Sequence, residues 1–379
     1  MLHLFRLGQF HLPTGGPKSL LIPPPIPFPV YMTAPNLKRP PAAKAGTESL
    51  DALRRRESVR NGLIRIGRRQ ATAALHRIEH SKKTDHTEDI HFVRVQCKRL
   101  RALLRLLKPV TDVEAVTREN LRLRDAGRAL SGFRDAFVAG ETFQQVFEGA
   151  APRHLRDASR LLGVKRAQIK SKQDLDTALK ECARTLRHIA DEFRQLPISA
   201  RGWMALAPGL EHSYRRARKD YQRCADRGAG HLGDCFHDWR KCVKDLGYQL
   251  EIFENLDNKE VHRMRKAVRR LGSLLGEDHD LIVFAEHVRE REKHYAGLAN
   301  FRPVRKRLRR RLKELREKEF TLAHKLFADK PRLWLRALAD QWKLWKNPDA
   351  GALVLTIEPP EPLAASPRSL GAAPALVMA

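Results

Sequence analysis

The chain has 379 residues, which is enough to bury the core of one large domain or of two modest ones. Its 73 Lys and Arg against 44 Asp and Glu give a net charge of +29, which favours polyanionic partners such as nucleic acid, an acidic membrane surface or polyphosphate. No apolar run reaches the roughly 18 residues of a membrane-spanning helix. Five cysteines without a Cys-x-x-Cys pair argue against a disulfide framework. We therefore expect a cytoplasmic protein.

Proline divides the chain into three parts. Ten of the 22 prolines lie in residues 1–46 and six lie after residue 346, which leaves six for the 300 residues between them. Because a proline inside a helix costs about 3 kcal/mol, the middle can be helical and the ends cannot. We predict a disordered Pro-rich arm over 1–46, with Met32 as an alternative start, a helical region over 47–346 and a disordered tail over 347–379.

Apolar residues recur at helical spacing through the middle of the chain, and strand signals are nearly absent. The first predicted helix, 47–79, begins with a capping box at Thr47, and the second, 91–108, ends at Pro109. The other predicted helices cover 113–131, 134–147, 153–162, 165–194, 210–225, 237–254, 259–275, 280–294, 302–328 and 331–346. The sequence predicts an all-α fold, in which Cys97 and Cys242 are small core residues.

The helix predicted over 91–108 separates its basic and apolar residues. At 100° per residue the basic side chains form one stripe roughly 100° wide. The 18 residues include no acid, although like charges at i,i+3 and i,i+4 repel by a few tenths of a kcal/mol per pair. The stripe is about 20 Å long, which suits a polymeric anion, and a solvated helix face is the alternative. Its members are His91, Arg94, Lys98, Arg101, Arg105 and Lys108.

Two motifs repeat at nearly the same offset. His91-x-x-Arg94-x-x-x-Lys98 recurs 146 residues later as His237-x-x-Arg240-x-x-x-Lys244, and Asp135 recurs 145 residues later as Asp280. We predict an internal duplication of one helical unit, with halves at 47–200 and 205–346. The second stripe ends in Glu251 and Glu254, where the first has cations. We expect Glu251 to pair with a cation from another helix, across the pseudo-twofold axis of the two halves.

Five segments resemble, in this order, the CHAD domain, the conserved histidine α-helical domain. They are HFVRVQCKRLRALLRLLKP (91–109), LSGFRDAFV (130–138), YRRARKDY (214–221), FHDWRKCVKDLGYQLEIF (236–253) and LLGEDHDLIV (274–283). The resemblance spans most of residues 47–330. It implies two pseudo-symmetric antiparallel helical bundles around a basic central cavity or groove. It also implies binding of inorganic polyphosphate, association with polyphosphate granules in bacteria, and no catalysis by the domain itself.

The resemblance also implies the site residues. The sequence departs from the family at Gly247, where Arg usually precedes the residue that is here Tyr248, and at Lys98, where Arg is commoner. We expect no catalytic residue, no metal and no cofactor. The family's histidines fall on His91, His237 and His279, its basic positions fall on Arg94, Lys98, Arg99, Arg101, Arg134, Arg240 and Lys244, and Arg105 is added from the stripe.

Other interpretations stay open. Nucleic acid is attracted by the same charge, but single-strand binders interleave aromatic residues for stacking, and 91–108 contains only Phe92. The run from Asp278 to Asp280 could belong to a metal-dependent phosphohydrolase, although the N-terminus of a helix also explains these acids. His91 and His237 could be core histidines.

A second basic segment covers residues 301–318, with ten Lys or Arg and two Glu. As a helix it has a thin apolar seam of Leu308, Leu312 and Leu315. It either faces solvent or takes part in anion binding.

Overall fold

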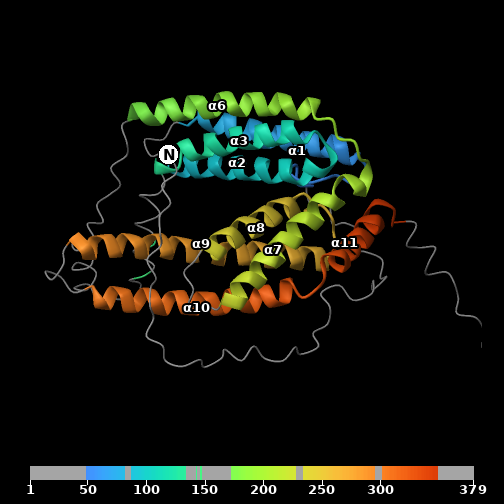
Figure 1. Cartoon of the computed structure of the whole chain (residues 1–379). Helices are drawn as coiled ribbons and strands as arrows, with labels where there is room; N and C mark the ends of the chain where they lie inside the picture. The colour runs from blue at the N-terminus through green and yellow to red at the C-terminus, as the bar shows by residue number, and fades with distance from the viewer. Residues whose placement is uncertain are drawn as a thin grey trace, which may run out of the picture.

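The computed structural model describes residues 48–81, 87–133, 142, 146, 172–227, 234–294 and 301–348. All regular structure in these residues is helical, which confirms the predicted all-α class (Figure 1). None of the described helices is long and apolar enough to cross a membrane. The Pro-rich arm, Arg134, the tail after 348 and, except for Thr142 and Val146, the predicted helices 134–147 and 153–162 lie outside the described residues.

Four helices form the first layer of the molecule (Figure 1). Helix α1 packs against α2 and α6, α2 packs against α3, and α3 packs against α6. A short 3₁₀ turn, Lys108–Val110, ends α2 where Pro109 stops the helix, as predicted. The bounds of these helices are α1 Val59–Glu79, α2 Thr87–Leu107, α3 Val113–Ala129 and α6 Lys172–Gln195.

Five helices form the second layer. Helix α8 packs against α7 and α9, α10 runs along α9, and α11 packs on α7. The far ends of α9 and α10 project from the bundle as a two-helix arm (Figure 1), which has its own apolar cluster. The bounds are α7 Ala207–Arg227, α8 Asp234–Glu251, α9 Lys259–His294, α10 Arg302–Leu326 and α11 Pro331–Lys346.

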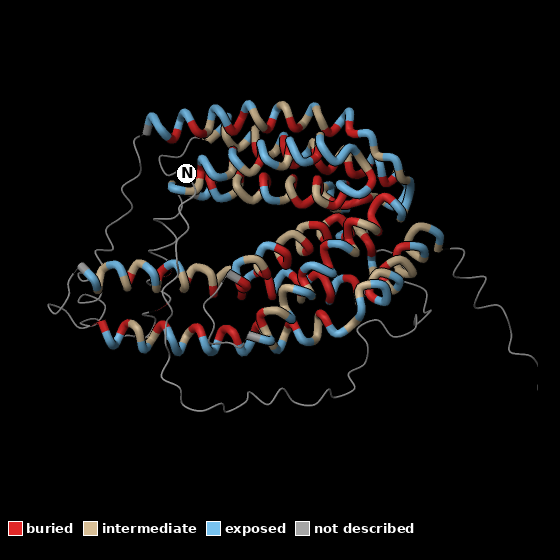
Figure 2. Tube along the Cα trace, in the orientation of Figure 1, coloured by how far each residue is buried: buried red, intermediate tan, exposed pale blue. Residues whose placement is uncertain are grey.

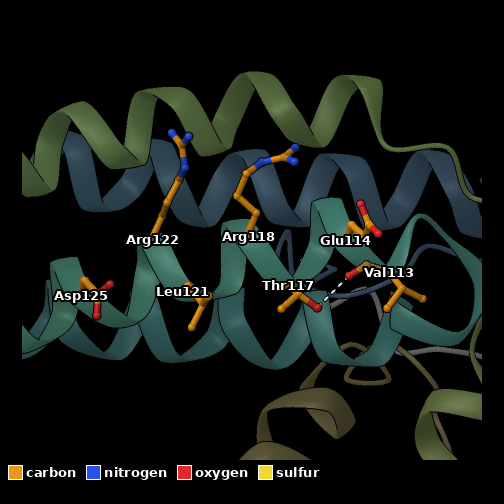
Figure 3. Close-up of a pocket in the computed structure, with 7 residues that line it drawn as sticks. All are labelled: Val113, Glu114, Thr117, Arg118, Leu121, Arg122 and Asp125. Carbon is orange, nitrogen blue, oxygen red and sulfur yellow. Dashed lines mark hydrogen bonds between the residues drawn. The ribbon is translucent and has the colours of Figure 1, made fainter.

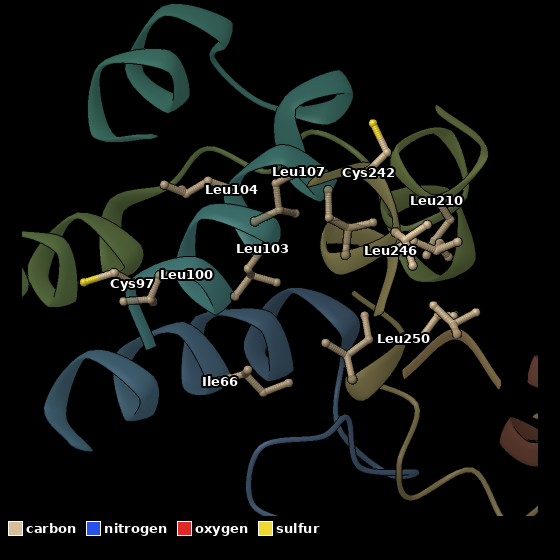
Figure 4. Close-up of a cluster of buried hydrophobic side chains, with 14 of the residues drawn as sticks. Ile66, Cys97, Leu100, Leu103, Leu104, Leu107, Leu210, Cys242, Leu246 and Leu250 are labelled. Carbon is tan, nitrogen blue, oxygen red and sulfur yellow. The ribbon is translucent and has the colours of Figure 1, made fainter. Parts of the chain in front are cut away.

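Helix α2 joins the two layers, because it packs against α1, α3, α7 and α8. The leucines of its apolar side are buried among leucines of α7 and α8 and Ile66 of α1 (Figures 2 and 4). Each such side chain contributes about 1.5–3 kcal/mol. A Cβ at Gly209 of α7 would lie 2.0 Å from the carbonyl oxygen of Leu106, so only glycine allows this approach. Cys97 and Cys242 are buried and free, as predicted.

Helix α1 begins at Val59, so the predicted start at Thr47 is wrong. Ser58 caps the helix, with its side chain accepting a hydrogen bond from the backbone N–H of Asn61 at 3.2 Å. The preceding residues are held in turns by a distant side chain: Asn255 accepts from the N–H of Ser49 at 2.7 Å and donates to the carbonyl of Leu53 at 3.1 Å. These long-range contacts outweigh the local capping signal.

Helix α9 is continuous over 36 residues, so the predicted break between 275 and 280 is wrong. Asp278 is buried in the middle of the helix and accepts from Arg316 of α10 at 2.8 Å; it does not cap a helix N-terminus. Buried Leu275 and Leu281 continue the apolar side of α9 past Gly276. A helical glycine costs only about 1 kcal/mol, which this packing offsets.

Candidate functional site

The crossing of α2 over α8 brings three cations together, and α9 borders them. Burial, followed by the charges of Arg240, Arg94 and Lys244, lowers the pKa of Lys98 to about 8. Burial and the charge of Arg240 likewise lower the pKa of Lys244. A Cβ at Gly272 of α9 would lie 3.4 Å from Cδ of Lys244, so the lysine stem runs along α9. We call Lys98, Arg240, Lys244, His237 and His279 the cationic site; the two histidines are described below.

These three side chains are crowded by the protein, yet solvent still reaches them. Lys98 is exposed, and Arg240 and Lys244 are half-buried, yet burial is the largest cause of the lowered pKa of each. None of the three forms an ion pair with a described acid. Asp280 of α9 is close enough to offset part of their charge. The site therefore keeps an excess of positive charge.

One hydrogen-bond donor of the cationic site is buried and has no partner among the described residues. Nε of Arg240 is buried without a hydrogen-bond partner among the described residues. A buried N–H without a partner costs about 1–3 kcal/mol. An anion beside Arg240 would accept a hydrogen bond from this donor and would also reduce the repulsion between the neighbouring cations.

Two of the three predicted histidines lie together. The rings of His237 of α8 and His279 of α9 have centroids 5.1 Å apart. Burial, followed by the charges of Arg240, His237 and Lys98, lowers the pKa of His279 to about 4, so its ring is neutral at pH 7. His91 and His237 are exposed, and the alternative that they are core residues is therefore wrong.

The remaining arginines of the first stripe have protein partners. Arg94 donates to the carbonyl of Gly127 at 2.6 Å, and Nε of Arg101 donates to Asn120 at 3.1 Å. Arg105 pairs with Asp245 of α8. These side chains border the cationic site or hold α2 in place, and they are less free to bind a ligand than Lys98.

The expected partner of Glu251 is Arg99. Glu251 of α8 pairs with Arg99 of α2 at 2.9 Å, and with Arg269 of α9 at 3.9 Å. This confirms that the acid in the second stripe meets a cation from another helix. It also places Arg99 in the contact between α2 and α8, whereas Arg134 lies outside the described residues.

The sequence assigns neither Asp280 nor Gly272 to the anion-binding site. Asp280 repeats Asp135 and belongs to the candidate phosphohydrolase run, and its place in the repeat is the signal that could have added it to the site. The role of Gly272 depends on the packing of α8 against α9, for which the sequence holds no local signal.

A hollow on the outer face of α3 is separate from the cationic site (Figure 3). It is lined by Val113, Leu121 and the stems of Arg118 and Arg122. Both guanidinium groups pair with the buried carboxylate of Glu119, at 3.0 and 3.7 Å. The hollow therefore offers no unpaired cation like those of the cationic site.

The described residues contain no group of three or more His, Cys, Asp or Glu that could hold a metal ion. Asp278, the first acid of the proposed phosphohydrolase run, is bound by Arg316 in the contact between α9 and α10.

The family model described as the CHAD domain matches residues 65–289, more than half of the chain. The matched region begins within α1 and ends within α9, so it includes the whole cationic site and leaves out α10 and α11. A search of curated proteins finds no match.

Proposed function

The chain belongs to the CHAD domain family, and we propose that it binds inorganic polyphosphate at the cationic site without altering the bound chain. The observation that carries the proposal is the convergence of Lys98, Arg240 and Lys244 from two helices with no ion pair to a described acid. Like charges held close together, where burial weakens their hydration, cost free energy in the unbound protein. Groups with such strongly perturbed pKa values are typical of functional sites.

A phosphate chain fits the donors that the site offers. The guanidinium of Arg240 presents a planar fork to phosphate oxygens, and the two lysines present point charges. His279 is neutral in the unbound protein and can donate one N–H. The described residues of the site form no row of exposed aromatic rings for stacking bases, which nucleic acid favours and polyphosphate does not need.

The test is a titration with polyphosphate of a variant that reverses the three charges, Lys98→Glu/Arg240→Glu/Lys244→Glu. We expect its affinity to fall by about 100-fold, which is about 2.7 kcal/mol. The matched control is Lys180→Glu/Arg184→Glu/Arg194→Glu on the exposed face of α6, and it should stay within about threefold of the wild type after correction for long-range screening. Equal losses in both variants would overturn the proposal.

Two further measurements address the alternatives. Single-stranded RNA that displaces polyphosphate at equal phosphate concentration would favour nucleic acid as the ligand. Orthophosphate release from the bound chain on addition of Mg²⁺ would contradict the non-enzymatic part of the proposal.

We further propose that the protein acts in the cytoplasm at polyphosphate granules, which the family resemblance supports. A fluorescently tagged chain that stays diffuse in granule-containing cells would contradict this location.

A further inference from the structure

Helix α10 carries a second row of cations on its outer side. Lys306, Arg309 and Lys313 are exposed and fall within an arc of roughly 60° at 100° per residue. We call these three residues the α10 stripe. Arg302 extends the same side by one turn, so that the row is about 16 Å long.

The orientation of the α10 stripe is fixed by the opposite side of the helix. The predicted seam of Leu308, Leu312 and Leu315 is buried against Phe284 and Val288 of α9, as expected from the sequence. Rotation of α10 would expose this seam, at a cost of about 1.5–3 kcal/mol for each side chain. The stripe therefore stays on the surface of the arm.

The α10 stripe is not neutralised by its neighbours. Lys306, Arg309 and Lys313 form no ion pair with a described acid. Of the nearby acids, Glu314 lies 3.8 Å from Arg310, and Glu292 of α9 pairs with Arg305. Glu317, one turn beyond Lys313 and also exposed, forms no ion pair with it. A helix exposed only to water normally alternates Glu with Lys or Arg at i,i+4.

The α10 stripe reaches the level of the cationic site along the helix axes. Arg316 of α10 binds Asp278, the residue before His279, so Lys313 lies less than one helical turn along α10 from the level of His279. Across the arm, the bodies of α9 and α10 separate the two sites by about two helix widths, roughly 20 Å, because the stripe faces away from α9. A long, flexible polyanion held at the cationic site can span this distance.

We propose that the α10 stripe is a second binding site for the same polyphosphate chain, so that long chains engage the protein at two places. This inference rests on the proposed function. The stripe lies beyond residue 289, where the match to the family ends, and so it is a property of this chain. Its side chains are only Lys and Arg, with no aromatic ring on which a base could stack.

Two linked sites raise the affinity for a chain that spans them and leave the affinity for a shorter chain unchanged. The probes are therefore a short oligophosphate that fits the cationic site alone and a long-chain polyphosphate. The variant is Lys306→Gln/Arg309→Gln/Lys313→Gln. The control is Lys180→Gln/Arg184→Gln/Arg194→Gln on α6, which removes the same charge from another surface.

We expect the α10 variant to lose about tenfold in affinity for the long chain and to bind the short one like the wild type. Its slope of log K against log salt should fall by about 2 for the long chain alone, since three phosphate contacts are removed. Wild-type affinity for the long chain, or an equal loss for both probes, would overturn the second site. Duplex DNA that displaces the long chain from the wild type but not from the variant would overturn polyphosphate as its ligand. Failure of the proposed function would look different from failure of the second site, because the wild type would then not bind even the short probe.

Discussion

The carboxylate of Glu251 lies 2.9 Å from the guanidinium of Arg99, which joins α8 to α2. A second ion pair, between Arg105 and Asp245, joins the same two helices. Asp245 follows Arg99 by 146 residues, and Glu251 follows Arg105 by 146 residues. A shift of 146 residues, which is the offset between the two histidine motifs, therefore maps the positions of each ion pair onto those of the other. An internal duplication predicts this relation, and the duplication itself stays a prediction.

The first half supplies both cations of these pairs and the second half supplies both acids. Burial raises the pKa of Glu251 and of Asp245, although their arginine partners act in the opposite direction. Burying the carboxylates therefore costs more than the pairing returns. We infer that the pairs specify how α2 meets α8: two identical copies of either half would place like charges together.

Reversing one charge should break this match. We expect Glu251→Arg to lower the free energy of unfolding by about 1–2 kcal/mol, because a half-buried Arg99 is left beside another cation. The double exchange Arg99→Glu/Glu251→Arg should recover most of the loss. Urea denaturation of the four proteins of this cycle measures the coupling. A double variant as unstable as the sum of the single variants would contradict the role of the pair.

Polyphosphate binding should weaken as the pH rises. Lys98, with a pKa of about 8, loses its charge between pH 7 and pH 9. A bound phosphate raises the pKa of both Lys98 and His279, so binding takes up protons and is favoured by acid. We expect affinity at pH 6 to exceed that at pH 9 by at least tenfold, with each group contributing at most about tenfold per pH unit.

Two variants assign the pH dependence to its groups. Lys98→Arg keeps its charge and should flatten the profile between pH 7 and pH 9. His279→Gln should flatten it between pH 5 and pH 7. Isothermal titration in buffers of different ionisation enthalpy measures the proton uptake directly. Equal wild-type affinity at pH 6 and pH 8 would remove the histidines from the binding site.

The cationic site should also lower the stability of the unbound protein. Because the pKa of Lys98 is lowered from 10.5 to about 8 in the folded chain, its charged form opposes folding below pH 8, and stability is regained as the pH rises from 8 to 10.5. Lys98→Gln should therefore raise the free energy of unfolding at pH 7, by up to about 1 kcal/mol after solvent screening. Saturating polyphosphate should reverse the order of the two proteins in thermal melts. A variant less stable than the unbound wild type would contradict this cost.

The sequence predicted most helices because these depend on periodicity within one helix. It failed at Thr47 and at Asp278, where distant partners decide the local structure: Asn255 holds the residues before α1, and Arg316 draws Asp278 into the core. The composition of the stripe did not separate Lys98, which forms no ion pair with a described acid, from Arg105, which pairs with Asp245. That distinction depends on the crossing of α2 over α8.

A buried acid on α10 should make stability depend on pH. Glu319 is 0% exposed, and neither carboxylate oxygen has a hydrogen-bond partner among the described residues. Burial and the charge of Asp278 raise its pKa from 4.5 to about 9. Between these values the unfolded chain releases the proton and the folded chain holds it, so stability falls as the pH rises, by up to about 1.4 kcal/mol per unit.

Glu319→Gln removes this titration and keeps the shape of the side chain. We expect it to be more stable than the wild type at pH 8, with a smaller difference at pH 5, in urea denaturation at both pH values. Glu317→Gln, at an exposed position of the same helix, is the control and should show no such divergence. A constant difference between pH 5 and pH 8 would mean that Glu319 is already ionised in the folded protein.

The last helix holds the first described segment of the chain in place through one ammonium group. Nζ of Lys346 donates to the carbonyl oxygens of Arg54, Arg55 and Glu57 at 3.1, 2.7 and 2.8 Å. It also lies 5.1 Å from the centre of the Trp342 ring. Three acceptors with a cation–π contact make this lysine worth more than an ordinary surface charge.

Lys346→Met keeps the apolar stem and removes the donor. We expect it to lower the free energy of unfolding by about 1–2 kcal/mol, because three carbonyl groups lose a charged donor at once. Lys343→Met, one turn earlier on α11 at a side chain that is 73% exposed, should change stability by less than about 0.5 kcal/mol. Polyphosphate affinity should be unchanged in both variants, since α11 lies outside the cationic site. Equal stability of the two variants would show that Lys346 does not hold the backbone before α1.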